Sequence, residues 1–137
     1  MSTEQENVDS LKRIYEWTNR ILGANRQEFR RADVEKYFAP DADMITNNQL
    51  KCRGIEAHIK HFEELQKKTR SLVFHPFEIV AAQGDRVGVY FNIDAQFADG
   101  REAKIYISGF FRMRDQKVVN FTELAHFEGE TLHLDNH

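Results

Sequence analysis

One carboxylate in this chain combines a reactive group with an apolar setting. Glu123 lies in an alternating run, Val118 to Phe127, and shares its side of that run with Phe121, Ala125 and Phe127. A carboxylate among aromatic side chains is desolvated, so its pKa rises toward values that suit a general acid or base. The alternative is structural: the alternation slips by one residue, or Glu123 pairs with a histidine or arginine.

His58 and His61 lie three residues apart in a segment with helical spacing, so both imidazoles can face one site. With Glu123 across a pocket they would form an acid–base set. Two alternatives remain open. Either histidine can simply be packed or half-exposed, or the same three residues can bind a metal, since two histidines and a carboxylate form a known ligand set. This spacing without a further motif is a weak metal signal, and we predict no metal site and no cofactor.

Tyr15 could donate a hydrogen bond to a substrate carbonyl and stabilise a developing oxyanion. Trp17, Tyr37 and Thr46 are candidate ligand contacts from the elements expected to cover a pocket. An aromatic residue on a helical stripe is more often part of the core, and Thr46, with the asparagines after it, more often caps a loop. The candidate catalytic set is Glu123, His58, His61 and Tyr15.

Three long alternating runs must position these side chains. They cover Arg86–Phe97, Ala103–Arg114 and Val118–Phe127, and a period of two is the signature of β-strands. Asp99-Gly100 between the first two runs is a strong hairpin signal, because glycine adopts positive φ at no steric cost. The expected inner faces carry Val87, Val89, Phe91, Ile93, Ala95 and Phe97 on the first strand, and Ile105, Ile107, Gly109, Phe111 and Met113 on the second.

The preceding half of the chain is mainly helical. We predict helices over Val8–Leu22, capped by Asp9 or Ser10, over Arg26–Phe38, and from Ile55 to about Thr69. Short strands are predicted over Ala42–Thr46 and Ser71–Ala82, with Pro76 indicating an edge position or a bulge in the latter. Residues 47–49 are predicted to form a loop.

This order of elements predicts the α+β class: N-terminal helices packed on a strongly curved antiparallel sheet. We expect one domain over residues 7–129, with flexible tails at 1–6 and 130–137. A net charge of −3 gives no general attraction to nucleic acid or membranes, and no apolar run is long enough to span a bilayer. The single cysteine and a polar, acidic start favour a cytoplasmic protein.

Several short segments together resemble the nuclear transport factor 2-like superfamily and, within it, the SnoaL-like group. They are Tyr37-Phe38-Ala39-Pro40-Asp41-Ala42-Asp43-Met44, Gly54-Ile55-Glu56-Ala57-His58-Ile59, Asp85 to Val89, Asp99-Gly100-Arg101, Phe110 to Met113, and Lys117-Val118-Val119. The resemblance covers about residues 7 to 128. It implies a cone with a pocket between the concave sheet and the helices, and it places Glu123 on the concave side.

The resemblance implies a small hydrophobic ligand, and Phe62, Phe91, Ile107, Phe111 and Phe121 are the expected walls of its site. Members of this family include ketosteroid isomerases, polyketide cyclases, dehydratases, epoxide hydrolases and pure binding or assembly domains. The ketosteroid isomerase pattern has two acids, and both are absent here. Thr46 occupies the position of the first acid, and the position of the second is close to Gly109. We therefore expect a cofactor-independent lyase, isomerase or hydrolase, or else a non-catalytic binding or assembly domain.

The opposite side of the same strands predicts an interface. Tyr90, Tyr106, Phe110 and Leu124 alternate with the inner set and make a surface that is too apolar to face water entirely. We expect a homodimer that packs through this convex face.

Overall fold

The structure, a computed structural model, describes residues 3–128. Its core element is a seven-stranded sheet with the order β2-β1-β7-β6-β5-β3, in which β4 also pairs with β5. The helices are α1 (Glu4–Leu22), α2 (Arg31–Tyr37) and α3 (Ile55–Lys68). The strands are β1 (Phe38–Thr46), β2 (Gln49–Arg53), β3 (Thr69–Phe74), β4 (Ile79–Gln83), β5 (Arg86–Phe97), β6 (Glu102–Arg114) and β7 (Lys117–Glu128).

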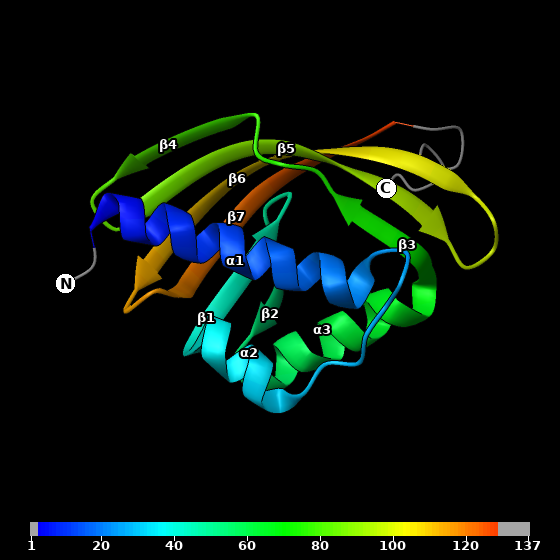
Figure 1. The fold of residues 1–137 in the computed structure, drawn as a ribbon, viewed down its shortest axis with the longest axis horizontal. Coiled ribbons are helices and arrows are strands. Elements are labelled where there is room, and N and C mark those ends of the chain that lie inside the picture. Colours follow the sequence, from blue (N-terminus) through cyan, green and yellow to red (C-terminus); the bar gives the residue numbers. More distant parts are fainter. Residues whose placement is uncertain (1–2, 129–137) are drawn as a thin grey trace.

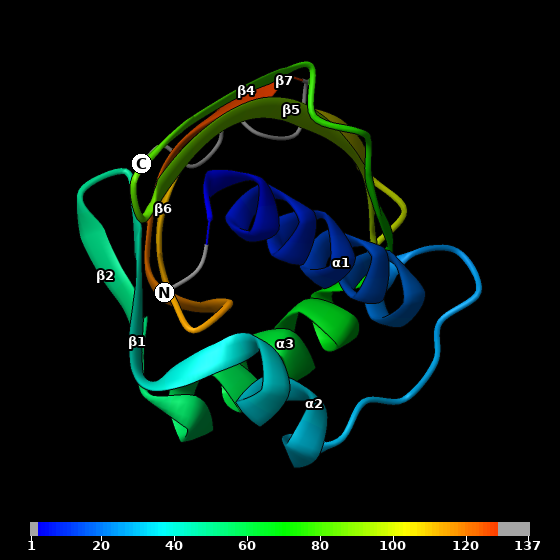
Figure 2. The same ribbon diagram turned by 60° about the vertical axis from the view of Figure 1, so that its left-hand side comes forward.

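The sheet curls around the helices, as Figures 1 and 2 show. Helix α1 lies inside the curve, and α3 and α2 cover its open side. We call the sheet face toward the helices the inner face and the opposite face the outer face. The α+β class and the curved, cone-like sheet predicted from the sequence are confirmed.

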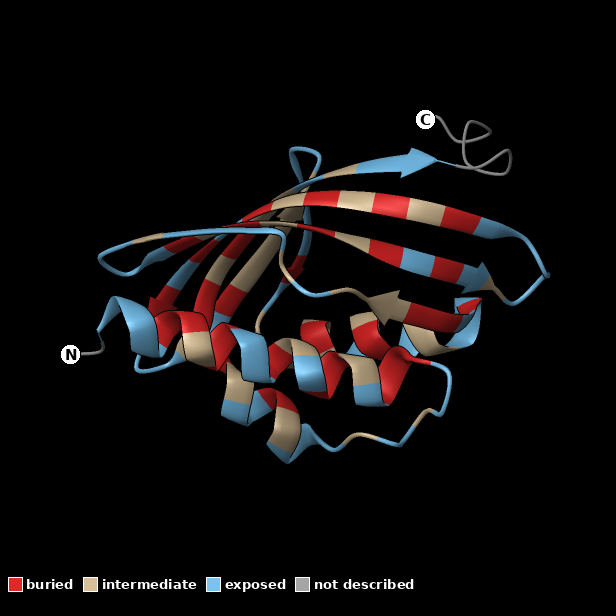
Figure 3. Ribbon diagram, turned by 45° about the horizontal axis from the view of Figure 1, so that its top comes forward, coloured by how far each residue is buried: buried red, intermediate tan, exposed pale blue. Residues whose placement is uncertain are grey.

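Alternating burial along β5 and β6 confirms the predicted faces of these two strands (Figure 3). Burial along β7 is less regular, since Val118 and Val119 are both buried. Strand β5 has the predicted bounds, and β6 and β7 extend the predicted runs by one or two residues. On the inner face, Phe91 is 1% exposed and Phe111 is 4% exposed. On the outer face, Phe110 is 59% exposed although it adjoins Phe111 in the chain.

The sheet is antiparallel, as predicted, except at one pair of strands. Strand β1 runs parallel to β7, with Thr46 opposite Glu123. Tight hairpins force consecutive strands to be antiparallel, but β1 and β7 are separated by most of the chain and are free of that constraint.

The N-terminal predictions need three corrections. Helix α1 begins at Glu4, so residues 4–6 belong to it, and Thr3 and Glu6 form its capping box in place of Asp9 or Ser10. Helix α2 is shorter than predicted. Residues 26–30, predicted to be helical, form no helix. The Arg26 guanidinium donates hydrogen bonds to the carbonyl oxygen of Leu22 at the end of α1 and to those of Gln66 and Thr69 at the end of α3. The predicted tail 130–137 lies outside the described residues.

Two strand predictions also change. Asn47 and Asn48 both have positive φ, 49° and 68°, and form a tight turn that leads into β2, a strand that the sequence reading missed. The predicted strand Ser71–Ala82 is two strands, β3 and β4. Pro76 lies between them, where it removes a backbone donor and ends the pairing. Of the helices within residues 3–128, none is long and apolar enough to cross a membrane.

Candidate functional site

A cavity of about 240 Å³ lies between the inner face of the sheet and helices α1 and α3. Most of its wall is apolar. The walls predicted from the sequence, Phe62, Phe91, Ile107, Phe111 and Phe121, all line it. The polar side chains of its lining are Tyr15, Thr18, Thr46, Lys51, His58, His61 and Glu123.

Glu123 is held by the strand that pairs with its own. The Thr46 hydroxyl donates a hydrogen bond to Glu123 Oε2 at 2.7 Å, from the position directly opposite in the β1–β7 pair. Burial raises the pKa of Glu123, and the Thr46 hydrogen bond and the charge of Lys51 lower it by less. The pKa of this carboxyl group is thus closer to neutral pH than the pKa of an exposed glutamate. A carboxyl group with such a pKa is suited to proton transfer.

Asn47 fixes the backbone around Glu123. Its backbone N–H donates to the Glu123 carbonyl at 3.0 Å, and its side-chain Oδ1 accepts from the Ala125 N–H at 2.9 Å. These bonds give Asn47 the loop-capping role that the sequence left as one alternative. They hold β7 in the register that directs Glu123 into the cavity.

The two histidines both line the cavity, as their spacing predicts, but their surroundings differ. His58 is 2% exposed, lies 4.7 Å from the Phe38 ring and places Nδ1 2.8 Å from the Gly54 carbonyl. A carbonyl accepts only, so Nδ1 carries the proton and Nε2 is the acceptor. Burial lowers the pKa of His61 to about 4, with smaller effects from His58, Lys51 and Lys68. His61 is therefore a neutral imidazole at physiological pH.

Tyr15 crosses from α1 into the cavity wall. Its ring packs against Phe74, Phe77, Phe91 and Phe111 with centroid distances of 5.2 to 6.1 Å. Burial, and then the charge of Glu123, raise the pKa of Tyr15 well above its usual value. Among residues 3–128, no partner accepts or donates a hydrogen bond at its hydroxyl. The phenol therefore stays protonated and keeps a donor for a ligand.

Trp17 and Tyr37 do not line the cavity, which corrects their predicted position as ligand contacts. Trp17 packs against Phe29, Tyr37 and Phe62 with centroid distances of 5.1 to 6.3 Å, in an aromatic cluster between α1, α2 and α3. Helical spacing places both residues inward. Helical spacing does not distinguish a side chain that lines the cavity from one that packs in the core between the helices.

Lys51 is the cavity residue that the sequence reading missed. It belongs to β2, a strand that was not predicted, and the pairing of β2 with β1 brings it to the cavity. The Asn47-Asn48 turn, followed by the alternating Leu50 and Cys52, was the available signal. Within residues 3–128, no group of three or more histidine, cysteine, aspartate or glutamate side chains could hold a metal ion.

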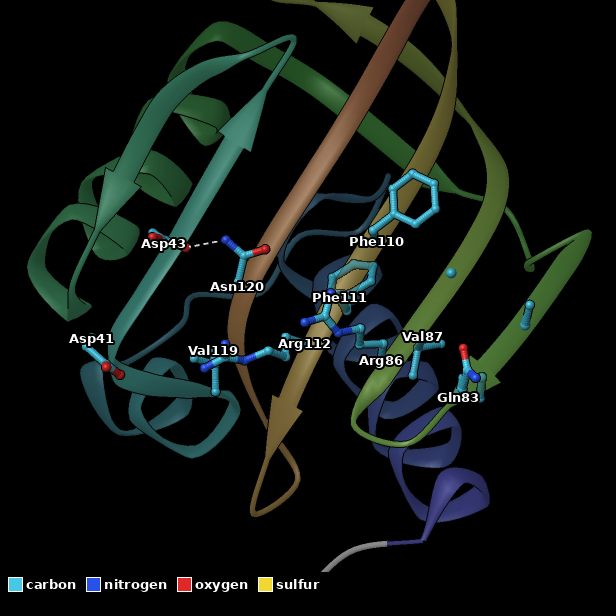
Figure 4. Close-up of a pocket in the computed structure, with 13 residues that line it drawn as sticks. Asp41, Asp43, Gln83, Arg86, Val87, Phe110, Phe111, Arg112, Val119 and Asn120 are labelled. Atoms are coloured by element: carbon cyan, nitrogen blue, oxygen red, sulfur yellow. Dashed lines mark hydrogen bonds between the residues drawn. The ribbon is translucent and has the colours of Figure 1, made fainter.

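The outer face carries an open groove of about 990 Å³, shown in Figure 4. Arg86 and Arg112 are direct cross-strand partners in it, and Asn120 donates to Asp43 at 2.5 Å. Phe110 stands out from β6 at its edge (Figure 4). The exposed side chains of this groove, such as Phe110 and Arg112, face away from the cavity, whereas Phe111 lines both the groove and the cavity.

The chain belongs to the SnoaL-like domain family, whose model matches residues 22–121. A protein from Jannaschia sp. CCS1 that is classed as a SnoaL-like polyketide cyclase is similar, with a TM-score of 0.71, 20% identity, and 91% of this chain and 88% of that chain covered. A nuclear transport factor 2-like protein from Anabaena variabilis is similar with a TM-score of 0.73, 15% identity, and 95% and 97% covered.

IdmH from Streptomyces antibioticus, also classed as a polyketide cyclase, is similar with a TM-score of 0.68, 15% identity, and 87% of this chain and 91% of that chain covered. No curated protein matches the sequence. At these identities the similar structures establish the cone-shaped fold and leave the reaction open.

Proposed function

We propose that the cavity binds a small hydrophobic molecule and that Glu123 acts on it as a general acid–base. The observation that carries this proposal is the Glu123 carboxyl group, placed in an apolar cavity and hydrogen-bonded to Thr46 at 2.7 Å. The reaction would be an isomerisation, cyclisation or dehydration without a cofactor, and the polyketide cyclases among the similar structures agree with this class.

The residues divide the chemistry in a consistent way. Glu123 removes a proton from a carbon next to a carbonyl or from a hydroxyl group, and the Thr46 hydrogen bond keeps its reactive oxygen oriented. The Tyr15 hydroxyl, which remains protonated, donates to the oxygen that becomes negative. His61 is neutral and can relay a proton, while His58 Nδ1 is engaged with Gly54.

This arrangement also explains how a carboxylate can work here without the ketosteroid isomerase acids. The position that carries the base in that pattern is Thr46, and the parallel β1–β7 pairing puts Glu123 directly beside it. In this proposal the base lies on the strand next to the one that carries it in that pattern. The second acid position is close to Gly109, over which the Phe121 ring lies.

A non-catalytic binding domain is the second candidate, and the mostly apolar wall of the cavity favours it. About 240 Å³ is below the roughly 300–1,000 Å³ typical of sites for drug-sized ligands, and the wall is mostly apolar. Such a protein would bind the same molecules and leave them unchanged.

The test is a screen of small unsaturated ketones, epoxides and lactones with the wild type and Glu123→Gln. Loss of a positioned general base costs roughly 10²–10⁴-fold in rate, so the variant should retain binding and lose turnover. Asp94→Asn on the outer face is the control and should keep full activity. Equal turnover by wild type and Glu123→Gln would contradict the catalytic role, and ligand binding without turnover by wild type would select the binding domain.

We also propose that the outer face forms a homodimer interface. Leu50, Ile79, Phe110 and Leu124 are 51 to 61% exposed and form an apolar band across the strands, and Tyr90 and Tyr106 lie beside it partly covered. A contiguous apolar surface of this kind is typical of protein contacts. A second copy would cover it about a two-fold axis.

The charges beside the band favour one orientation of the two copies. Arg86 and Arg112 lie at one end of the face, and like charges directly opposite destabilise a sheet unless an anion neutralises them. The other end carries Asp94 and Glu128 on either side of Lys104, which forms an ion pair with Asp94, so these three residues leave one net negative charge. A two-fold axis across the strands places the basic end of each copy over the acidic end of the other.

Phe110→Glu with Leu124→Glu should give a monomer, as measured by mass in solution, whereas wild type runs as a dimer at micromolar concentration. Arg86→Glu with Arg112→Glu should weaken the dimer, and adding Asp94→Lys with Glu128→Lys should restore it. A monomeric wild type at that concentration would refute the interface.

A further inference from the structure

Lys51 reaches the cavity because of an irregularity in the β1–β2 pair. Met44 pairs with Cys52, but the next residue of β1, Ile45, pairs with Leu50. One residue of β1 therefore opposes two of β2, and Lys51 is the extra residue of a β-bulge. Regular alternation would turn Lys51 away from the side that Cys52 faces. The bulge instead lets Lys51 join Met44 and Thr46 in the cavity lining.

The side chain of Lys51 lies where the cavity meets solvent. The residue is exposed and yet lines the cavity, which has an otherwise apolar wall. Its ammonium group interacts electrostatically with both Glu123 and His61. Its only hydrogen bond within residues 3–128 is a long one, 3.5 Å, to Gln49 Oε1, and none of its interactions there is an ion pair.

A lysine on an edge strand often serves only to prevent association with other sheets, and β2 is an edge strand. That role requires a charge directed into solvent beyond the edge. Lys51 is turned inward by the bulge, and bulges are frequent next to active sites, where they redirect one side chain. The geometry thus points to a role inside the cavity.

We propose that Lys51 binds a negatively charged oxygen of the ligand at the mouth of the cavity. This rests on the proposed ligand-binding function of the cavity. The ligand is then a small molecule, of one or two rings to fit about 240 Å³, with an apolar body against the phenylalanine wall and an anionic oxygen at one end. That oxygen is either a permanent carboxylate or a hydroxyl or enol that ionises in the cavity and gives its proton to Glu123.

The two sources of the charge agree with the position of Glu123. A carboxylate ligand would meet Glu123 in its protonated form, which can donate a hydrogen bond to the anion. An ionising ligand would transfer its proton to Glu123, so the negative charge moves from the glutamate to the ligand while Lys51 stays positive. In both cases the ligand and Glu123 together carry one net negative charge, and Lys51 is the cation that faces it.

The experiment measures binding of matched probes to the full chain by calorimetry. The probes are naphthalene-2-carboxylate and its neutral analogue naphthalene-2-carboxamide. A third probe, 4-nitrophenol, reports its own ionisation in the cavity by its absorbance. The variants are Lys51→Met, which removes the charge, Lys51→Arg, which keeps it, and Lys60→Met, a control on the exposed side of α3. Circular dichroism checks that each variant is folded.

Wild type should bind the carboxylate about tenfold more tightly than the carboxamide, a modest value for a charged hydrogen bond at a partly exposed site. Lys51→Met should lose this preference, and Lys51→Arg and Lys60→Met should keep it. If Lys51→Met loses the preference for the carboxylate but ionises 4-nitrophenol as wild type does, the anionic oxygen is a permanent carboxylate. If 4-nitrophenol ionises less in Lys51→Met than in wild type, Lys51→Arg and Lys60→Met, the anionic oxygen is one that ionises in the cavity.

Two results would overturn the proposal, and they differ in what else they affect. Equal binding of carboxylate and carboxamide, with 4-nitrophenol ionising alike in wild type and Lys51→Met, refutes the role of Lys51 and leaves the cavity as a ligand site. Failure of every probe to bind refutes the ligand site itself, and the role of Lys51 with it.

Discussion

The inner and outer faces of β5, β6 and β7 use the same backbone and have opposite properties. Phe111 on the inner face is 4% exposed, and Phe110 on the outer face is 59% exposed, although they are neighbours in the chain. The helices cover one face only (Figure 2). Alternation therefore assigns side chains to faces, and the position of the helices decides which face becomes the core.

Carboxylates on the two faces show the same contrast in their chemistry. Burial raises the pKa of Glu123 on the inner face. On the outer face, the hydrogen bond from His75 and the charge of Lys104 lower the pKa of Asp94. One environment prepares a carboxyl group for proton transfer, and the other keeps it ionised as part of a surface ion-pair network.

The largest expected difference is in stability and compares two adjacent phenylalanines. Phe111→Ala should lower the free energy of unfolding by about 3–5 kcal/mol, because it leaves a cavity in the core beside the stacked Phe121 ring. Phe110→Ala should cost less than about 1 kcal/mol to the folded subunit. Urea unfolding of both variants, at a concentration where they have the same mass in solution, measures this. Equal losses would mean that the outer face is packed as tightly as the core.

The next effect concerns pH. In the unfolded chain His61 binds a proton near pH 6.5, but in the folded chain only near pH 4, because burial lowers its pKa to about 4. Between these values the unfolded state binds more protons, so this histidine makes the protein lose stability as pH falls from about 6.5 to 4. The loss is at most about 3 kcal/mol.

His61→Gln should remove this part of the acid sensitivity, measured as the free energy of unfolding at several pH values relative to wild type. Glu123 contributes with the opposite sign, since its raised pKa favours the folded state at low pH, so the comparison with wild type isolates His61. His126→Gln on the outer face is the control. A pH profile that changes equally in both variants would contradict the contrast between the faces.

The smallest effect compares two glycines. A Cβ at Gly109 would lie 2.8 Å from the Phe121 ring on the inner face, whereas one at Gly88 would lie at an ordinary 3.6 Å from the Phe110 ring on the outer face. Gly109→Ala should cost about 1–3 kcal/mol, since Phe121 must move toward the cavity. Gly88→Ala should be neutral or stabilise by up to about 1 kcal/mol. Thermal unfolding of the pair tests this, and a harmless Gly109→Ala would show that Phe121 has room to move.

Some site residues were predictable because their signal is local. The alternation around Glu123 correctly gave its side of β7, and the spacing of His58 and His61 correctly gave a shared helical side. Tyr15 lines the cavity as expected, but Trp17 and Tyr37 do not, although all three are aromatic residues expected to face inward from the helices. Helical periodicity predicts the direction in which a side chain points, but it does not predict whether that side chain contacts the cavity or the packed core.

The alternating strands, their hairpins and the long helices could be predicted from the sequence, because periodicity and turn chemistry act over a few residues. The parallel pairing of β1 with β7 and the position of Lys51 could not, since both depend on how distant segments come together. Thr46 and Glu123 are 77 residues apart, as are Asn120 and its partner Asp43. Contacts at that separation depend on the closing of the whole sheet, and no local pattern specifies them.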